Sequence, residues 1–319
     1  MMRSGGEGEE ARGGASANRR AASPRTFAAF GTIVAAAPIA SGLHVVATPI
    51  GNLGDITLRA LSVLAAADAV LAEDTRVSRV LLDHYAIDTP LVPYHEHNAA
   101  AMRPQILARF GRGEALALVS DAGTPLISDP GYKLVIETVA AGHAVTAAPG
   151  ASAVMAGLVL GGLPTDRFFF EGFLPSKSGA RRSRIAEIAA IPGTLVLFES
   201  ARRLPEALAD LAAVMGPRAA VVARELTKRF ETVRRGTLVE LAALYEAEGP
   251  PKGEVVVLVS PPGEAAPSSV ADVEDALAAA MATMSLKDAA TVVAAGTGLP
   301  RREVYARALA LAAAKRGRD

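Results

Sequence analysis

The stretch ALALVSDAGTP (residues 115–125) decides the interpretation of this chain, because an apolar run ends there in an acidic residue and a glycine-containing turn. The run Ala115–Val119 predicts a buried strand, and Asp121 with Gly123 predicts the loop that leaves it. Ligands of open α/β sheets bind outside the carboxyl ends of the strands, so we expect a functional loop here. An isolated Asp-Ala-Gly is more often an ordinary strand-to-helix turn, so the functional interpretation depends on the rest of the chain.

The segments around this strand repeat one pattern of short apolar strand, turn and helix. Thr57 is the expected cap of the helix that follows the first strand. Two further strand ends carry Gly, Pro or Ser turns, at residues 49–54 and 149–152. The alternation predicts an α/β fold with a parallel sheet covered by helices. We expect its strands at 43–47, 69–72, 115–119 and 144–147.

A second α/β domain is expected beyond the apolar segment Phe168–Pro175, which we interpret as a crossing between domains. Its strands are expected at 194–198, 220–223 and 254–259, and its helices at 205–214 and 238–247. Three helices at 273–281, 286–295 and 301–314, with a Gly-containing turn before the last, resemble a helix-turn-helix. The predicted division is a disordered extension at 1–41, α/β domains at 42–166 and 167–262, and a linker with a helical tail at 263–319.

Composition limits the classes of protein to which the chain can belong. With 319 residues, half of them hydrophobic, it can bury a large core and form two domains. The absence of cysteine excludes disulfides, thiolate metal sites and a cysteine nucleophile, and is consistent with a reducing cytosol. Residues 19–40 imitate a secretory leader, but Pro24 and Pro38 interrupt them. No apolar segment is long enough to span a bilayer, so we expect a cytoplasmic protein without membrane contact.

Charge is distributed unevenly along the chain, although the formal net charge is +0. Residues 43–174 carry 8 Lys and Arg against 13 Asp and Glu, a net charge of −5. Residues 175–235 carry 12 against 6, or +6, and residues 301–319 carry 6 against 2, or +4. A phosphate backbone would be attracted to the two basic regions. The alternative is a solvated surface on which the charges happen to be uneven.

Established ligand motifs narrow the chemistry. None of the turns matches G-x-G-x-x-G with a following acidic residue, and there is no G-x-x-x-x-G-K-[ST] sequence. A zwitterionic nucleoside ligand is more consistent, with Asp121 holding an amino group or ribose hydroxyls. His95 and His97 have no third ligand at a recognisable spacing, so no metal site is expected. A nucleophile elbow G-x-S-x-G does not accompany Ser120 and Asp121, so hydrolase chemistry is not supported.

Six ordered motifs give the chain a resemblance to a known family. They are ATPIGNLGD (47–55), EDTR (73–76), SDAGTP (120–125), EGFLP (171–175), FES (198–200) with Arg203, and ARELTK (223–228). Residues 43–260 resemble the bacterial ribosomal RNA small subunit methyltransferase I family, and residues 286–308 resemble the helix-turn-helix appended in many members. Members of this family methylate the ribose 2′-oxygen of a cytidine in 16S rRNA. They form a branch of the tetrapyrrole-methylase class of S-adenosylmethionine-dependent enzymes.

The resemblance implies two α/β domains with S-adenosylmethionine in the cleft between them, a homodimer, and the small ribosomal subunit as partner. The residues that would line the cofactor are Pro49, Asp121, Gly123, Thr124, Ser152, Ala153, Phe198 and Leu226. Those that would face the RNA are Glu73, Asp74, Arg76, Asn98, Arg203 and Arg224. For each Arg or Lys, the structural alternative is a solvated charge or an ion pair.

The methyl group of a sulfonium donor is already activated, so the enzyme mainly needs to align the acceptor oxygen and exclude water. A base near the ribose hydroxyl would help, and His97, Glu199 and Lys228 are the candidates, between which the sequence does not choose. Lys228 would act as a base only if burial or a cationic neighbour lowered its pKa. Two other functions stay open: methylation of a tetrapyrrole at carbon or nitrogen, and non-catalytic RNA binding in ribosome assembly.

Overall fold

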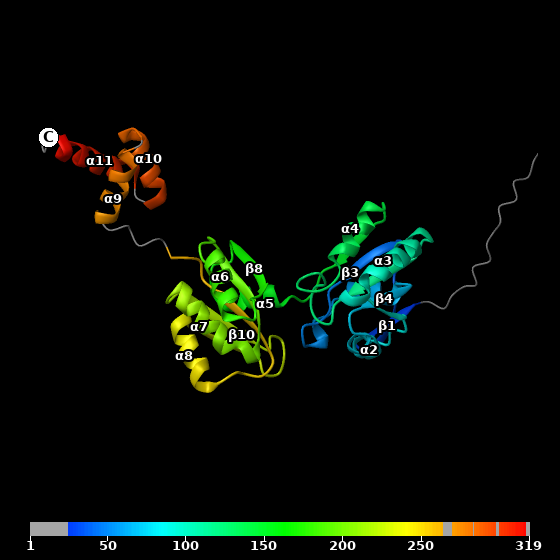
Figure 1. Cartoon of the computed structure of the whole chain (residues 1–319). Coiled ribbons are helices and arrows are strands. Elements are labelled where there is room, and N and C mark those ends of the chain that lie inside the picture. Colours follow the sequence, from blue (N-terminus) through cyan, green and yellow to red (C-terminus); the bar gives the residue numbers. More distant parts are fainter. Residues whose placement is uncertain (1–24, 264–269, 283, 298–299, 317–319) are drawn as a thin grey trace, which may run out of the picture. The chain divides into compact units, whose positions relative to one another are not determined.

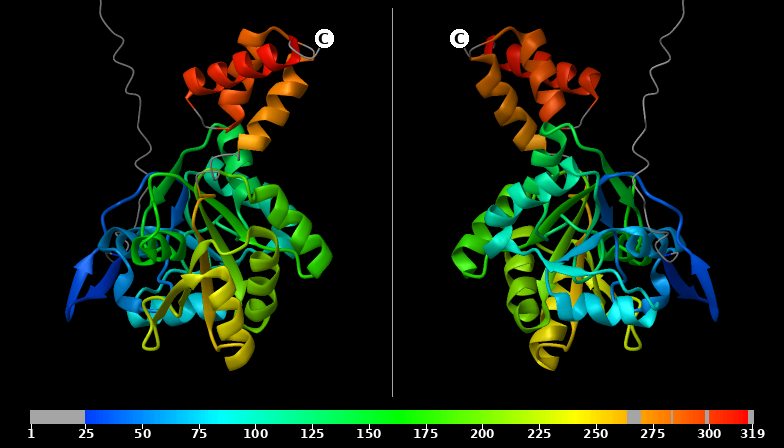
Figure 2. Two further views of the ribbon diagram at one scale, coloured as in Figure 1. Left: turned by 90° about the vertical axis from the view of Figure 1, so that its left-hand side faces the viewer. Right: turned by 90° about the vertical axis from the view of Figure 1, so that its right-hand side faces the viewer.

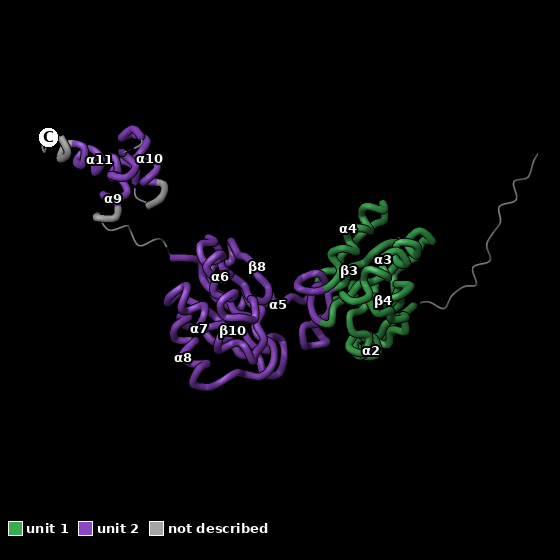
Figure 3. The backbone as a smooth tube through the Cα atoms, in the orientation of Figure 1, with its two compact units in different colours: residues 1–46, 56–121, 130–149 green, residues 47–55, 122–129, 150–319 purple. Residues whose placement is uncertain are grey.

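The computed structural model describes residues 25–263, 270–282, 284–297 and 300–316 (Figure 1). It has two compact units, coloured separately in Figure 3. Unit 1 comprises residues 1–46, 56–121 and 130–149, and unit 2 comprises residues 47–55, 122–129 and 150–319. We had expected each domain to be one continuous stretch with a boundary at residue 166. The structure differs, because the strand-end segments 47–55 and 122–129 belong to unit 2 although the strands before them belong to unit 1.

Unit 1 contains a five-stranded parallel sheet in the order β5-β4-β6-β3-β7. All residues of β4 and β6 are buried, as expected for parallel strands that are covered on both faces. The parallel sheet predicted from the alternating pattern is therefore confirmed. The strands are β3 (Gly42–Val46), β4 (Ala69–Ala72), β5 (Leu91–Pro93), β6 (Ala115–Val119) and β7 (Val145–Ala148). The helices are α1 (Leu58–Ala66), α2 (Thr75–His84), α3 (Glu96–Gly111) and α4 (Tyr132–Ala140).

Helix α1 begins as the sequence predicted. The Thr57 hydroxyl oxygen accepts a hydrogen bond from the Ala60 backbone N–H at 3.1 Å, which satisfies one of the free N–H groups of the first turn. Leu61 and Leu64 of α1 are buried. Their spacing of three residues places both side chains on the face of the helix that packs into unit 1.

The prediction of a disordered extension up to residue 41 is wrong for residues 25–41. Strands β1 (Thr26–Ala29) and β2 (Thr32–Ala35) form an antiparallel hairpin in unit 1. Its turn is Phe30-Gly31, both with positive φ, as a two-residue type I′ turn requires. Phe27 is buried, and the Ala28 N–H donates to the Tyr85 carbonyl oxygen at 2.7 Å. Residues 1–24 lie outside the described part of the chain.

Unit 2 contains a five-stranded mixed sheet in the order β11-β10-β12-β9-β8. Strands β8 and β9 are parallel, and the other neighbours are antiparallel. The segment Phe168–Pro175 had been interpreted as a crossing between domains, but residues 168–173 form the edge strand β8. The strands are β8 (Phe168–Phe173), β9 (Thr194–Ser200), β10 (Ala219–Arg224), β11 (Thr232–Thr237) and β12 (Glu254–Val259).

Helices cover both faces of the sheet in unit 2 (Figures 1 and 2). Strand β12 shows the alternation, because Val255 and Val257 belong to one core cluster and Val256 and Leu258 to another. The first cluster includes buried side chains of α6 (Ser178–Ile188), α7 (Leu204–Met215) and α8 (Leu238–Glu248). The second includes Val154 and Leu158 of α5 (Ala153–Gly161).

The three helices expected in the tail are present as α9 (Val270–Met281), α10 (Leu286–Thr297) and α11 (Arg301–Arg316). They share a small apolar core of their own, made by Val273, Leu277, Ala290, Val293, Val304 and Ala308. Within the described residues, no helix has the length and apolar character that a membrane span requires.

Candidate functional site

Three strand-end turns that the sequence singled out are joined within unit 2. Thr48 and Gly123 exchange two backbone hydrogen bonds, of 2.8 and 3.1 Å. The Thr124 hydroxyl donates to the Ala151 carbonyl oxygen at 3.2 Å. Segments 47–55 and 122–129 and the start of α5 therefore form one surface, although up to about a hundred residues separate them in the sequence.

This surface lines a pocket in unit 2 with a volume of about 410 Å³. Most of the lining side chains are apolar or small, with a few charged and hydroxyl groups among them, which is the usual composition of a small-molecule site. The segments 47–55 and 122–129 contribute Ile50, Ala122, Gly123, Thr124, Ile127, Ser128 and Asp129. The remaining residues are Ser152, Ala153, Val154, Phe173, Phe198, Glu199, Ser200, Ala201, Ala223, Leu226, Gly253, Glu254, Val255 and Val256.

Six of the eight residues predicted to contact the cofactor line this pocket, namely Gly123, Thr124, Ser152, Ala153, Phe198 and Leu226. Ile50 lines it, whereas its neighbour Pro49 is not among the lining residues. Asp121 belongs to unit 1, where its Oδ1 accepts a hydrogen bond from the Asp74 N–H at 3.0 Å. The carboxylate of Asp121 therefore ties together the loops that follow β4 and β6.

The backbone of the segment 122–129 is strained beside the pocket. Gly123 has a φ of +79°, and a Cβ there would lie 3.2 Å from Cγ2 of Ile50. Leu126 and Ser128 also adopt positive φ, 73° and 67°, which is uncommon for residues with a side chain. Strain of this kind persists where the surrounding structure imposes it, and it gathers at ligand sites.

Aromatic rings form the apolar part of the pocket. The Phe198 ring lies with its centroid 4.9 Å from that of Phe170 and 5.7 Å from that of Phe173, in edge-to-face geometry. Such pairs hold each other in one orientation, so they provide a firm wall for a flat ligand group.

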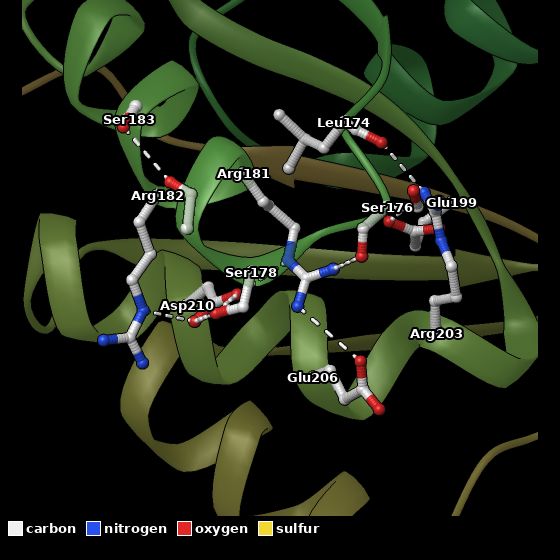
Figure 4. Close-up of polar contacts among 11 residues, drawn as sticks. Leu174, Ser176, Ser178, Arg181, Arg182, Ser183, Glu199, Arg203, Glu206 and Asp210 are labelled. Carbon is white, nitrogen blue, oxygen red and sulfur yellow. Dashed lines mark hydrogen bonds and ion pairs between the residues drawn. The ribbon is translucent and has the colours of Figure 1, made fainter.

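Glu199 is buried next to Phe198 and is held as part of a bidentate ion pair (Figure 4). Its Oε1 accepts from Nε of Arg203 at 2.8 Å and from the Ser200 N–H at 2.7 Å, and its Oε2 accepts from Nη2 of Arg203 at 3.0 Å. The hydrogen bonds with Glu199 raise the pKa of Arg203. Nη2 of Arg203 also donates to the Leu174 carbonyl oxygen at 3.0 Å. Both carboxylate oxygens are thus already engaged with donors of the protein.

Lys228 lacks the lowered pKa that a catalytic base at this position would need. Its Nζ donates to Oε1 of Glu225 at 2.9 Å and to Oε2 of Glu254 at 2.8 Å. Burial lowers the pKa of Lys228, but the two carboxylates outweigh burial, and the pKa lies above its ordinary value of 10.5. The amine is therefore protonated at neutral pH and cannot accept a proton.

The remaining predicted residues of unit 1 lie at the starts of α2 and α3. Asp74 caps α2, with Oδ1 accepting from the Arg76 N–H at 2.8 Å, and it forms a 2.6 Å ion pair with the exposed Arg76 side chain. Burial and the neighbouring Asp121 carboxylate raise the pKa of Glu73. The carboxylates of Glu73, Asp74 and Asp121 thus lie at the carboxyl ends of the neighbouring strands β4 and β6.

The sequence His95-Glu96-His97 begins helix α3 and is not part of a strand. Oδ1 of Asn98 accepts from the His95 N–H at 2.9 Å, and its Nδ2 donates to the Pro93 carbonyl oxygen at 3.0 Å. Asn98 therefore fixes the start of the helix, while His97 is exposed on its first turn. Over residues 25–263 and the described parts of the tail, no three His, Asp or Glu side chains are grouped as metal ligands would be.

Comparison with known proteins places the chain in a family. Residues 42–242 match the family model for tetrapyrrole (corrin/porphyrin) methylases, and residues 267–312 match that for the RsmI C-terminal HTH domain. A ribosomal RNA small subunit methyltransferase I from Mesorhizobium japonicum is 50% identical over 88% of this chain and 95% of its own length. The chain belongs to the ribosomal RNA small subunit methyltransferase I family. The protein of that name from Xylella fastidiosa is 47% identical, over 82% of this chain and 97% of its own.

Solved structures support the fold. Uroporphyrin-III C-methyltransferase from Thermus thermophilus, complexed with S-adenosylhomocysteine, has a TM-score of 0.51 at 19% identity, over 69% of this chain and 97% of that chain. The family to which this chain belongs consists of S-adenosylmethionine-dependent methyltransferases, so the methyl donor of this chain is S-adenosylmethionine. The pocket of unit 2 fits such a ligand, because it combines an aromatic wall, carboxylates and a glycine whose missing Cβ leaves room.

Several lining residues of this methyltransferase were not predicted from the sequence. Phe173 lies inside the quoted motif EGFLP, so the motif pointed to it without identifying it. Val255 and Val256 come from the start of β12, which reads as an ordinary buried strand. Nothing in an alternating run of valines distinguishes a ligand contact from a core contact.

Proposed function

We propose that the protein transfers the methyl group of S-adenosylmethionine to the ribose 2′-oxygen of a cytidine in 16S rRNA of the small ribosomal subunit. The observation that carries the proposal is the 50% identity, over 95% of its length, to a relative named for methylating small-subunit rRNA. The match of the tail to the RsmI C-terminal HTH domain supports the same partner. Motif residues of the predicted cofactor set line the pocket, which supports the donor site.

The lining residues suggest how the donor is held in the pocket of unit 2. When bound, S-adenosylmethionine supplies a methyl group already activated by the sulfonium charge. Phe198 and Phe173 offer flat apolar faces, which favour a cationic group such as the sulfonium. Ser152 caps α5, so Ala153 and Val154 present backbone N–H groups of the first turn, which favour an anionic ligand group.

Alignment, more than proton removal by one side chain, is the main contribution that we assign to the protein. Lys228 is protonated, and the oxygens of Glu199 are occupied by Arg203 and Ser200, so neither is free to act as a base. His97 is exposed in unit 1 and stays a candidate. Bound S-adenosylmethionine would supply its activated methyl group to the 2′-oxygen, and the hydroxyl proton would pass to water or to His97.

The decisive experiment incubates the protein with labelled S-adenosylmethionine and small ribosomal subunits that lack the modification, then maps the label within the RNA. Label on one cytidine ribose is the expected result. Label on a base would contradict the proposed 2′-oxygen, and label on uroporphyrinogen instead of RNA would favour the tetrapyrrole alternative. A protein that binds subunits but no donor would be a non-catalytic assembly factor.

We also propose a homodimer that acts in the cytoplasm, where small subunits are assembled. The support is an exposed apolar stripe on α4 of unit 1, made by Tyr132, Ile136 and Val139. These side chains lie four and three residues apart, so they share one helix face, and unpaired apolar faces of this kind mark association sites. Sedimentation should show a dimer that Ile136→Glu converts to a monomer, and an unchanged sedimentation coefficient would exclude this face.

A further inference from the structure

Phe230 is an exposed aromatic residue that the fold does not need. Its side chain is 64% exposed, in a chain with only 4% aromatic residues. It lies in the loop 225–231, which connects β10 to β11 in unit 2. Single exposed apolar side chains are common, so exposure alone carries no functional meaning. What distinguishes Phe230 is the way in which the protein holds it.

The loop 225–231 is held by hydrogen bonds from Arg224, which we had predicted to face RNA. Nη2 of Arg224 donates to the Phe230 carbonyl oxygen at 3.1 Å, and Nη1 donates to that of Lys252 at 3.0 Å. Nε donates to Oγ1 of Thr232 at 3.1 Å. All three nitrogens of this guanidinium thus donate within the protein. Arg224 therefore joins the loop 225–231 to the turn before β12 and acts as a positioning residue.

Further contacts fix the loop in one conformation. The Thr227 N–H donates to Oε2 of Glu231 at 2.7 Å, and the Glu231 N–H donates to the Lys228 carbonyl oxygen at 3.2 Å. Glu225 and Thr227 have φ values of 53° and 65°, in the left-handed region that side chains disfavour. Two such residues in one short loop persist only where the surrounding contacts impose them. The exposed ring is therefore presented on a rigid support.

Two exposed cations, Arg229 and Lys252, lie on the two segments that Arg224 joins. The Arg229 guanidinium carbon lies 5.5 Å from the centroid of Phe230, and the side chains of Arg229 and Lys252 are exposed. Within the described ranges neither forms an ion pair with a carboxylate, in contrast to Lys228 between Glu225 and Glu254. We call Arg229, Phe230 and Lys252 the basic rim. Flat rings beside arginine and lysine are the groups with which proteins bind unpaired nucleotides.

The basic rim adjoins the donor pocket through the backbone. Leu226 of the same loop lines the pocket, and so do Gly253 and Glu254, which directly follow Lys252. A nucleic acid strand bound to the rim would thus lie beside the pocket, on the side where β10 ends and β12 begins.

We propose that the basic rim binds single-stranded RNA next to the methylated nucleotide, with Phe230 stacking on an unpaired base and Arg229 and Lys252 contacting phosphates. This inference rests on the proposed function and adds the recognition of an unpaired strand to it. A base inside a duplex is already stacked on both faces, so an exposed ring selects for a strand whose bases are free. The rim is cationic and RNA is a polyanion, whereas a second copy of this chain has a formal net charge of +0. Charge complementarity therefore favours RNA as the occupant.

The test uses the full chain, labelled S-adenosylmethionine and unmodified small subunits. Phe230→Ala should raise the KM for the particles about tenfold, since stacking on one base is worth ~1.4 kcal/mol or more. Phe230→Trp keeps a flat ring and should restore the wild-type KM. Arg229→Gln and Lys252→Gln should each flatten the dependence of log affinity on log salt by about 0.7, the value for one contact to a single strand. Calorimetry should show unchanged donor affinity in all four variants.

Matched controls come from unit 1. Phe30→Ala removes a ring that is even more exposed, 94% against 64% for Phe230, and Lys133→Gln removes an exposed cation. Both variants should leave KM and salt dependence unchanged. An active wild type whose KM is unaltered by Phe230→Ala would overturn the rim and leave the function intact. A wild type that transfers no label to RNA would instead overturn the proposed function. A Phe230→Ala variant with altered sedimentation and normal RNA kinetics would assign the rim to self-association, which also overturns the inference.

Discussion

Asp210 of α7 is the centre of a buried ion network in unit 2, and removing its charge should strongly destabilise the protein (Figure 4). Its carboxylate accepts hydrogen bonds from Oγ of Ser178 at 3.0 Å, from Nε of Arg181 at 2.7 Å and from Nε of Arg182. The side chains of Arg181 and Asp210 are only 1% and 4% exposed. Asp210→Asn keeps the shape of the side chain but leaves the Arg181 guanidinium buried without its counter-charge.

The magnitude follows from burial. Deleting one partner of a buried ion pair costs about 3–5 kcal/mol, against roughly 0–1 kcal/mol for an exposed pair. Arg181 keeps a hydrogen bond to the Ser176 carbonyl oxygen at 3.1 Å, and its nearest other carboxylate, on the exposed Glu206, is 3.7 Å away. Neither replaces a carboxylate at 2.7 Å. We therefore expect Asp210→Asn to lower the free energy of unfolding by about 3 kcal/mol or more at neutral pH.

The effect should depend on pH in one direction. Burial raises the pKa of Asp210, but the hydrogen bonds from Arg182, Arg181 and Ser178 outweigh burial and hold the pKa below its ordinary value of 3.8. A carboxylate with a lowered pKa stabilises the folded state above the unfolded-state pKa, and this stabilisation is lost as the pH falls through the lowered value. The difference between wild type and Asp210→Asn should thus be largest at neutral pH and shrink below pH 3.8.

Urea denaturation of both proteins measures the difference. Arg112→Gln, which breaks a more exposed pair with Glu114, is the control and should cost less than about 1 kcal/mol. The double variant Arg181→Met with Asp210→Leu should recover most of the stability, because an apolar pair carries no buried charge. If the free energies of unfolding of Asp210→Asn and wild type differ by less than about 1 kcal/mol, Arg181 is not the uncompensated buried charge that we infer.

Three other changes test the site and the fold. Gly123→Ala should weaken donor binding at least about tenfold in calorimetry, because the added Cβ would crowd Ile50 and because the positive φ disfavours a side chain. Gly113→Ala is the control, since Gly113 also has a positive φ but has open space around it, and donor affinity should stay unchanged. Lys228→Met should keep measurable turnover and an unshifted pH–rate profile, and total loss of turnover with both ligands bound would restore Lys228 as a base. Thr57→Ala should lower the free energy of unfolding by about 1 kcal/mol through the lost cap of α1, and no change would mean that water replaces the hydroxyl.

Buried strands were the part of the fold that the sequence predicted best. The apolar runs at 69–72, 115–119 and 254–259 coincide with β4, β6 and β12. Strand β11 was missed because its sequence, TVRRGT, is that of a half-exposed edge strand with no apolar repeat. The hairpin β1–β2 was missed because its turn is Phe30-Gly31 and not the usual Asn-Gly.

Part of the candidate site could be predicted from the residues that stand in turns after strands. Gly123, Thr124 and Ser152 stand in such turns, and all three line the pocket. Asp121 stands in the same turn as Gly123, but its carboxylate accepts from the Asp74 N–H in unit 1. The two residues are only two positions apart, yet one contacts unit 1 and the other lines the pocket of unit 2, and the sequence carries no signal that separates them.

The distribution of charge shows why a count along the sequence does not locate an interface. Residues 175–235 have a net charge of +6, yet Arg181, Arg184 and Lys228 are paired with carboxylates inside unit 2. Arg224 donates instead to backbone carbonyls and a hydroxyl, so its charge organises a loop. In this segment, within the part of the chain that the structure describes, the exposed cations without a carboxylate or carbonyl partner are Lys177, Arg202 and Arg229. Of these, Arg229 is the one that stands next to an exposed ring, so the proposed RNA interface depends on the three side chains of the basic rim and not on the total charge.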